Sequence, residues 1–310
     1  MEWTGMSTSD RLISVVIPAF NYAKTLPRAV ESVMIQLGPR SELLVIDDGS
    51  TDETPAVIEQ MQRKYAGGFR AIRKPNGGLS SVRNLGIVEA RGAYLVFLDA
   101  DDEMAPDALR LLAEHLEQNP GTRMVIGGHW AVWADGKRRK HLPAPLPDGH
   151  LARLQGYLID KTIALANGAS ALHRDVFQFG NYPESFRNAE DIPVFSQALA
   201  NFHCTVLAEP LALIHKHDDS MRHDIRSDCA VGFSVVSEVF DQGRVPVEML
   251  LLRKPFKAQR CLSLFRGMLS AGQNVEAREM YRQAISTDWR VIFKISYTRK
   301  ALRLWLGLKR

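Results

Sequence analysis

Apolar and polar positions alternate in a regular way over the first third of the chain. Four short apolar runs predict buried strands, at 12–17, 43–46, 69–72 and 94–98. The stretches between them place apolar residues three or four positions apart, which predicts helices over 25–37, 54–65 and 80–91. Repeated strand–helix units of this kind favour an α/β fold with an open, mostly parallel sheet that carries helices on both faces.

The pattern changes in the later part of the chain. A helix over 106–118 and a strand over 123–133 are expected next, and 134–150 is expected to be an exposed loop because it is rich in proline and basic residues. From residue 228 onward the pattern is mostly helical. We therefore expect an α/β domain over 1–224, with halves at 12–104 and 105–224, and an appended helical region over 225–310.

Composition narrows the class of protein. The chain has 310 residues, 45% of them hydrophobic and 24% charged, which is enough to bury a large core. No run approaches the roughly 18 apolar residues of a membrane-spanning helix, and the first ten residues lack the pattern of a secretory signal. The three cysteines have no paired spacing, so neither a disulfide framework nor a zinc site is indicated. These features predict a cytoplasmic protein.

Charge is distributed unevenly along the chain. Residues 225–310 contain 16 Lys and Arg against 7 Asp and Glu, a net charge of +9, whereas the remainder has a net charge of −5. Residues 290–310 hold seven basic residues, no acidic one, and apolar residues between them. Such a segment suits an interfacial helix on the anionic inner face of the cell membrane, or an ordinary terminal helix with a solvated basic face. Both remain open.

Polar clusters follow each of the four predicted strands. They are Pro18-Ala19-Phe20-Asn21, Asp47-Asp48-Gly49-Ser50, Asn76-Gly77-Gly78 with Arg83-Asn84, and Asp99-Ala100-Asp101-Asp102. The carboxyl ends of parallel strands meet at one edge of a sheet, where such folds bind ligands. The clusters are therefore expected to form one site.

The last cluster carries the clearest chemistry. Asp99, Asp101 and Asp102 repel one another unless a cation lies between them, and a hard divalent ion such as Mn²⁺ or Mg²⁺ prefers their oxygen ligands. The alternative is that these residues cap the helix expected at Pro106. The second cluster, around Asp47, is likewise compatible with a plain turn leading into a helix.

Together the four clusters resemble family 2 glycosyltransferases of the GT-A fold. The resemblance covers residues 12 to about 220, and it is carried by Val15–Asn21, Val45–Asp52, the Asn76–Asn84 segment and Phe97–Asp102. It implies a Rossmann-like sheet and a nucleotide-diphosphate sugar as donor, with uridine as the favoured base.

The resemblance also implies roles for single residues. Pro18, Phe20 and Asp47 match positions that hold the base, and Arg83 lies near the base or the diphosphate. Asp99, Ala100 and Asp101 match the ribose and metal contacts, with Asp101 as the direct metal ligand. The other positions of the donor-binding motifs are Asn21, Asp48, Asn76 and Gly77. His217, three residues before Ser220, matches a segment that closes over the diphosphate and is a further metal candidate.

A second acidic motif lies about ninety residues further on. Asn188–Pro193 resembles the family's Glu-Asp motif, in which Asp191 is the general base and Glu190 orients the site or binds acceptor. Acidic capping of a helix over 192–200 is the alternative. A base of this kind implies single displacement with inversion. The 167–174 segment fits the family only loosely, so the acceptor is defined only as a surface glycan or a lipid-linked glycan.

Other classes of protein fit less well. An Asp-x-Asp phosphatase places its motif after the first strand, and a dinucleotide-dependent oxidoreductase needs GxGxxG there, but this chain has Pro-Ala-Phe-Asn. A non-catalytic nucleotide-sugar-binding scaffold held by its basic helices remains an alternative. The expected partners are the donor, a glycan or lipid-linked acceptor, an anionic membrane surface and a second copy of the chain. Nucleic acid is not expected, because no nucleic-acid-binding module accompanies the charge.

Overall fold

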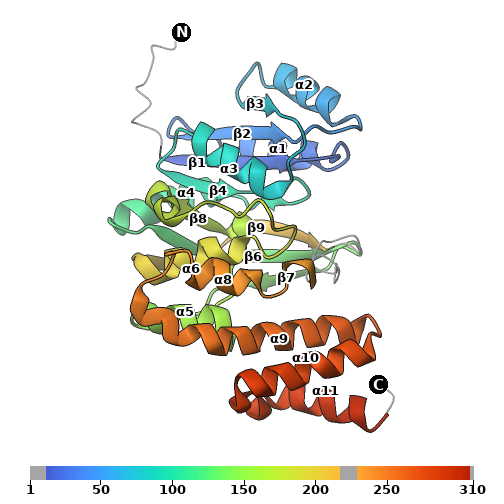
Figure 1. Ribbon diagram of the computed structural model, residues 1–310. Coiled ribbons are helices and arrows are strands. Elements are labelled where there is room, and N and C mark those ends of the chain that lie inside the picture. The colour runs from blue at the N-terminus through green and yellow to red at the C-terminus, as the bar shows by residue number, and fades with distance from the viewer. Residues whose placement is uncertain (1–11, 217–228, 308–310) are drawn as a thin grey trace. The chain divides into compact units, whose positions relative to one another are not determined.

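The computed structural model describes residues 12–216 and 229–307 of the protein (Figure 1). The described chain forms two compact units. The first comprises residues 12–147, 163–184 and 202–216, and the second comprises residues 148–162, 185–201 and 229–307. The predicted boundary at residues 224 and 225 lies outside the described residues, so that division stays a prediction.

The first unit is built on one nine-stranded sheet with the strand order β3-β2-β1-β4-β8-β6-β9-β5, and β7 pairs with β6. Its leading half confirms the predicted parallel pattern. The strands are β1 (Ile13–Ala19), β2 (Ser41–Asp47), β3 (Arg70–Arg73) and β4 (Tyr94–Phe97), all parallel to their neighbours within this half. The connecting helices are α1 (Leu26–Met34), α2 (Thr54–Lys64) and α3 (Leu79–Glu89).

Strand β1 is buried on both faces because its alternate residues face different helices. Val15 and Ile17 share a core cluster with the buried face of α1. Val16 points the other way, toward Gly86 of α3, where an added Cβ would lie 2.8 Å from a Val16 methyl carbon. The near-continuous apolar runs of the sequence thus become strands covered on both sides.

The second half of the sheet is mixed in direction. Strand β8 (Ser170–His173) is antiparallel to β4 and to β6 (Met124–Trp133), and β9 (Cys204–Lys216) is parallel to β6. The short β5 (Glu103–Met104) pairs with β9, which brings the end of β9 next to the residues that follow β4. Helix α4 (Ala108–Gln118) and the 3₁₀ helices η3 (Asn167–Ala169) and η4 (Arg174–Phe179) complete the unit.

The prediction of a loop over 134–150 is wrong at the centre of this segment. Residues Arg138–His141 form β7, an edge strand antiparallel to β6. Asp135-Gly136 makes the tight turn, with Gly136 at φ +82°, and backbone pairing with β6 outweighs the polar composition. The exposed basic side chains of this edge discourage pairing with another chain.

The second unit is helical, as predicted for the C-terminal region. It contains α5 (His150–Gln155), the π-helix η2 (Gly156–Asp160), α6 (Asp191–Asn201), α8 (Ser234–Phe240), η6 (Val247–Leu252), α9 (Arg253–Ser270), α10 (Asn274–Thr287), η7 (Trp289–Phe293) and α11 (Ile295–Trp305). Helix α10 lies between α9 and α11 (Figure 1), around a core that includes Cys261, Phe265 and Tyr281. No helix within 12–216 or 229–307 is long and apolar enough to cross a membrane.

Candidate functional site

Asn21 ties the loop after β1 to the loop after β2. It adopts the left-handed conformation, with φ +60°, and its Oδ1 accepts hydrogen bonds from the backbone N–H groups of Thr51 (2.8 Å) and Asp52 (3.3 Å). Its own N–H donates to Ser50 Oγ at 2.9 Å. The neighbouring Phe20 is left with 43% of its surface exposed. A fixed loop thus presents an aromatic ring to solvent, as stacking on a nucleobase requires.

Two consecutive aspartates at the end of β2 are both buried, but they make different contacts. Asp47 Oδ1 accepts the N–H of Ser50 at 2.9 Å, and its Oδ2 lies 3.2 Å from the Arg73 guanidinium. Asp48 instead organises the 76–78 loop. Its carboxylate accepts the N–H groups of Gly77 (2.9 Å) and Gly78 (2.7 Å) and pairs with Lys74 Nζ at 2.7 Å.

Gly49 allows these two loops to approach closely. It has φ +73°, and an added Cβ would lie 2.9 Å from the backbone nitrogen of Asn76. Asn76 Nδ2 in turn donates to the carbonyl of Asp48 at 3.1 Å. The Asp47 and Asn76 clusters therefore form one continuous surface, as the sequence predicts.

Arg83 joins helix α3 to the acidic cluster. Its side chain is 2% exposed, and its Nη2 donates to Asp99 Oδ1 at 3.1 Å. The guanidinium carbon lies 5.3 Å from the ring centre of Tyr182, which fixes its position by a cation–π contact. Arg83 is thus a buried cation that is paired with the half-exposed Asp99.

The acidic cluster follows β4 directly. The N–H of Asp102 donates to the carbonyl of Asp99 at 3.0 Å, which turns the chain, and Arg28 Nη2 donates to the carbonyl of Asp101. Asp102 is 6% exposed, and its Oδ1 accepts the N–H of His215 in β9. Helix α4 begins later, at Ala108 with Asp107 as N-cap, so the cluster does not cap that helix.

The carboxylates of this cluster lie within electrostatic range of one another. Burial, and then the charges of Asp99 and Asp101, raise the pKa of Asp102 to about 8. Burial and the same carboxylates also raise the pKa of Tyr22, with Asp101 the largest of the charge effects. Tyr22 was missed from the sequence, although it directly follows Asn21. The structure thus brings the end of the β1 loop to the acidic cluster.

The oxygen ligands that the acidic cluster offers fit a hard divalent cation. Asp99 and Asp101 offer carboxylate oxygens, and the repulsion that raises the pKa of Asp102 would be relieved by a cation. Over 12–216 and 229–307 there is no group of three or more His, Cys, Asp or Glu side chains placed to hold a metal. Water or ligand oxygens would complete the coordination. His217 lies outside the described residues.

The raised pKa of Asp102 predicts that the stability of the folded protein depends on pH. Its folded-state pKa lies above the ordinary value of 3.8, so the folded state binds the extra proton and is favoured at low pH. This stabilisation is lost as pH rises from about 4 through about 8. Asp102→Asn keeps an acceptor for His215 and removes the charge. In EDTA at pH 8.5 we expect its Tm to exceed the wild-type Tm by about 4 °C or more.

The pH profile separates this effect from a general change in packing. At pH 5, where wild-type Asp102 is protonated, the two Tm values should nearly coincide. The matched control is Asp135→Asn, an exposed aspartate of the β6–β7 turn. Equal Tm values of wild type and Asp102→Asn at both pH values would contradict the raised pKa.

The second unit holds the other predicted pair. Asp191 begins α6, and Glu190 just before it is 8% exposed. Ala189 has φ +60°, and its N–H donates to Asn188 Oδ1, so the motif forms a sharp turn into the helix. An acidic residue in the first turn of α6 also favours the helix electrostatically. Both predicted roles of Asp191 are therefore compatible with its place.

A cluster of cations near Asp191 was not anticipated from the sequence. The pKa of Lys161 is lowered by removal of its ammonium from water and by the charges of Lys294 and Arg260, whereas Asp191 acts in the opposite direction. Lys161 lies just after η2, in the left-handed conformation, with its Nζ 5.7 Å from the Tyr157 ring centre. Only tertiary packing brings these residues together, so no local pattern could reveal them.

Comparison with known proteins identifies the family. The model of glycosyl transferase family 2 matches residues 14–179. The succinoglycan biosynthesis protein ExoO of Rhizobium meliloti (strain 1021) is 27% identical over 245 residues, which cover 74% of this chain and 67% of ExoO. An uncharacterized glycosyltransferase of Rickettsia felis is 30% identical over 182 residues, 59% of this chain, but the match spans only 29% of that relative's length.

Solved structures share the fold. Staphylococcus aureus TarS 1-349 in complex with UDP has a TM-score of 0.63 at 18% identity, covering 88% of this chain and 81% of TarS. The mannosyltransferase PcManGT of Pyrobaculum calidifontis, in complex with GDP-Man and Mn²⁺, has a TM-score of 0.57 at 14% identity, covering 97% and 86%. The fold is that of the GT-A glycosyltransferases. The chain belongs to glycosyl transferase family 2.

Proposed function

We propose that this enzyme transfers a sugar from a UDP-sugar to a hydroxyl group of a glycan acceptor, with inversion and with the help of a divalent cation. The observation that carries the donor assignment is the meeting of four chain segments at one edge of the sheet, joined by the Asn21, Asp48 and Arg83 contacts. Relatives with nucleotide or nucleotide sugar bound, TarS with UDP and PcManGT with GDP-Man, support the same class of donor.

Different residues of the site are assigned to different parts of the sugar nucleotide. Phe20 offers a ring face and Asp47 a carboxylate for the base, beside the buried Pro18. Arg83 offers positive charge to the diphosphate, and Asp48 acts indirectly, because it holds Asn76 and Gly77 in place. Each contact with the donor is a prediction from the family motifs.

Asp99 and Asp101, flanking Ala100, would hold Mn²⁺ or Mg²⁺. A bound divalent cation stabilises the negative charge that develops on the leaving diphosphate. In the chain itself, Arg83 pairs with the Asp99 carboxylate, and Arg28 fixes the backbone of Asp101. The Mn²⁺ of the PcManGT structure supports this part of the proposal.

Asp191 would remove the proton from the acceptor hydroxyl, and Glu190 would orient the acceptor or its base. A positioned carboxylate of this kind typically contributes a factor of about 10²–10⁴ to the rate. Direct attack by the acceptor on the anomeric carbon inverts its configuration. This assignment rests on the Asn188–Pro193 motif of the family and on the place of Asp191 at the start of α6.

We further propose that the acceptor is a cell-surface or lipid-linked glycan and that the protein works at the inner face of the cell membrane. The name of ExoO, a succinoglycan biosynthesis protein, supports the class of acceptor. The basic second unit supports the location.

A nucleotide-sugar panel tests the proposed function. With Mn²⁺ present, we expect a saturating UDP-sugar to raise the Tm by about 5 °C or more, because a ligand at 100 times its Kd stabilises by about 2.7 kcal/mol. EDTA should abolish this shift. Release of UDP in the presence of acceptor separates the enzyme from a non-catalytic scaffold. No shift with any nucleotide sugar, and no nucleotide release, would refute the proposal.

A further inference from the structure

Helix α11 has two apolar faces, of which only one is buried. Tyr297, Ala301 and Leu304 pack on the core cluster formed by α9 and α10. On the opposite side Ile295, Leu302 and Leu306 are 62%, 51% and 71% exposed. These three residues are four or seven positions apart and so form one stripe along the helix. Packing within the unit explains the first face and leaves the second without a partner in the described residues.

Neighbouring elements extend this exposed surface. In η7 the side chains of Trp289, Ile292 and Phe293 are exposed, and the rings of Trp289 and Phe293 contact each other edge to face at 5.7 Å. Because η7 leads directly into α11, Phe293 lies two residues before Ile295 in the chain. We call Trp289, Ile292, Phe293, Ile295, Leu302 and Leu306 the apolar stripe.

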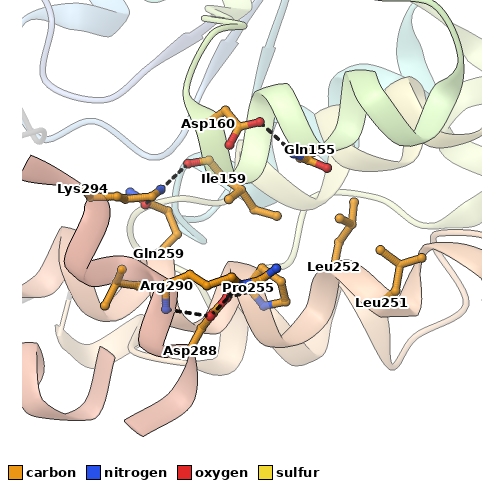
Figure 2. Close-up of a pocket in the computed structure, with 11 residues that line it drawn as sticks. Gln155, Ile159, Asp160, Leu251, Leu252, Pro255, Gln259, Asp288, Arg290 and Lys294 are labelled. Atoms are coloured by element: carbon orange, nitrogen blue, oxygen red, sulfur yellow. Dashed lines mark hydrogen bonds and ion pairs between the residues drawn. The ribbon is translucent and has the colours of Figure 1, made fainter. Parts of the chain in front are cut away.

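Residues of η6 and η7 line one pocket of the second unit. Leu251 and Leu252 of η6 line this pocket of about 360 Å³ together with Arg290 and Val291 of η7 (Figure 2). Leu251 is 61% exposed and is a further exposed apolar residue at this pocket. The pocket also holds Lys294, whose Nζ donates to the carbonyl of Ile159. All of these residues belong to the second unit.

The segment that contains the apolar stripe carries charges of one sign. Residues 289–307 contain five basic residues and no acidic one. Arg299, Lys300 and Arg303 are exposed, and they form no ion pair within the described part of the chain. On the α11 surface Arg299 and Arg303 border the stripe, four and eight residues after Ile295. Acidic residues of the neighbouring elements are Asp288, which pairs with Arg290, Asp160 of the pocket lining, Glu248 of η6, and the exposed Glu276 and Glu279 of α10.

We propose that the apolar stripe, with Arg299 and Arg303 at its border, docks on the surface of an anionic lipid bilayer. Apolar side chains flanked by basic ones match the boundary between acyl chains and acidic headgroups, and tryptophan favours this interface. A symmetric contact with a second copy fits less well, because it would bring together the basic residues of two chains with no acidic residue of 289–307 to balance them. The inference rests on the proposed location of the enzyme at a membrane.

Vesicle co-sedimentation of the full chain tests this surface without any sugar transfer, so its failure is distinguishable from failure of the transferase. We expect binding to phosphatidylcholine vesicles with 30% phosphatidylglycerol, and about tenfold weaker binding to phosphatidylcholine alone. Ile295→Gln/Leu302→Gln and, separately, Arg299→Gln/Arg303→Gln should each weaken binding to the anionic vesicles about tenfold.

Matched controls lie in the first unit. Ile35→Gln/Val88→Gln changes two apolar residues that are more exposed than Ile295 and Leu302, and Arg138→Gln/Arg139→Gln changes two exposed arginines of β7. Neither should alter binding. Wild-type affinity in both test variants, or no binding of the wild type, would overturn the proposal. So would a lipid-free dimer that Ile295→Gln/Leu302→Gln dissociates, because the stripe would then belong to a second copy.

Discussion

Asp191→Asn is expected to bind donor with wild-type affinity and to lower kcat by about a thousandfold. Asparagine keeps the size and the helix-starting preference of aspartate, but it cannot accept the acceptor's proton. Donor binding is measured as the UDP-sugar shift of the Tm with Mn²⁺, and turnover as UDP release. Loss of turnover without loss of the thermal shift would separate a base from a donor ligand.

The alternative role of Asp191, stabilising the start of α6, predicts a different result. A lost helix-dipole interaction costs about 0.3–1 kcal/mol of stability and leaves turnover unchanged. The matched control is Asp107→Asn, because Asp107 is an exposed aspartate at the start of α4. Wild-type turnover in Asp191→Asn would show that the carboxylate serves only the helix. Loss of the UDP-sugar shift would also contradict its assignment as the base.

Asp101→Asn is expected to abolish the Mn²⁺-dependent thermal shift with UDP-sugar and to lower turnover by about a thousandfold or more. Loss of a metal that stabilises the leaving group costs several kcal/mol of transition-state stabilisation. The backbone should stay in place, because Arg28 donates to the carbonyl of Asp101 and not to its carboxylate.

Metal titration makes this prediction specific. The variant should need at least about tenfold more Mn²⁺ for any remaining shift, whereas the metal-free Tm should not fall, because one of three mutually repelling carboxylates is removed. Asp135→Asn, the exposed aspartate of the β6–β7 turn, is the control and should behave as wild type. An unchanged Mn²⁺ requirement in Asp101→Asn would show that Asp101 is not a ligand of the metal.

The leading half of the sheet was predictable because its signals are local. Apolar runs such as 12–17 and 43–46 have the length and composition of strands buried on both faces, and the segments between them have helical periodicity. The strand β7 escaped prediction, because Arg138–His141 is polar and is held by pairing with a distant strand. Strand β8 lies antiparallel to both β4 and β6. Its direction likewise could not be predicted, because it depends on pairing with strands far away in the chain.

Within the candidate site, residue types did not reveal the contacts that each side chain makes. The sequence predicts that Asp48 contacts the sugar nucleotide. In the structure its two carboxylate oxygens accept hydrogen bonds from the 76–78 loop and from Lys74. Tyr22 and Lys161 carried no local signal, because their surroundings come from segments far away in the chain. For the C-terminal segment, the structure shows that α11 packs on α10 and still exposes an apolar stripe, and contact of this stripe with a membrane stays a prediction.

By itself the sequence determined the α/β class, the family and the order of the clusters at the strand ends, because periodicity and motif spacing are properties of neighbouring residues. Only the tertiary structure decided that Asp99 meets Arg83, that burial beside Asp99 and Asp101 raises the pKa of Asp102, and which face of α11 stays exposed. Burial and electrostatic coupling depend on distances through space, and those distances exist only once remote segments have packed together.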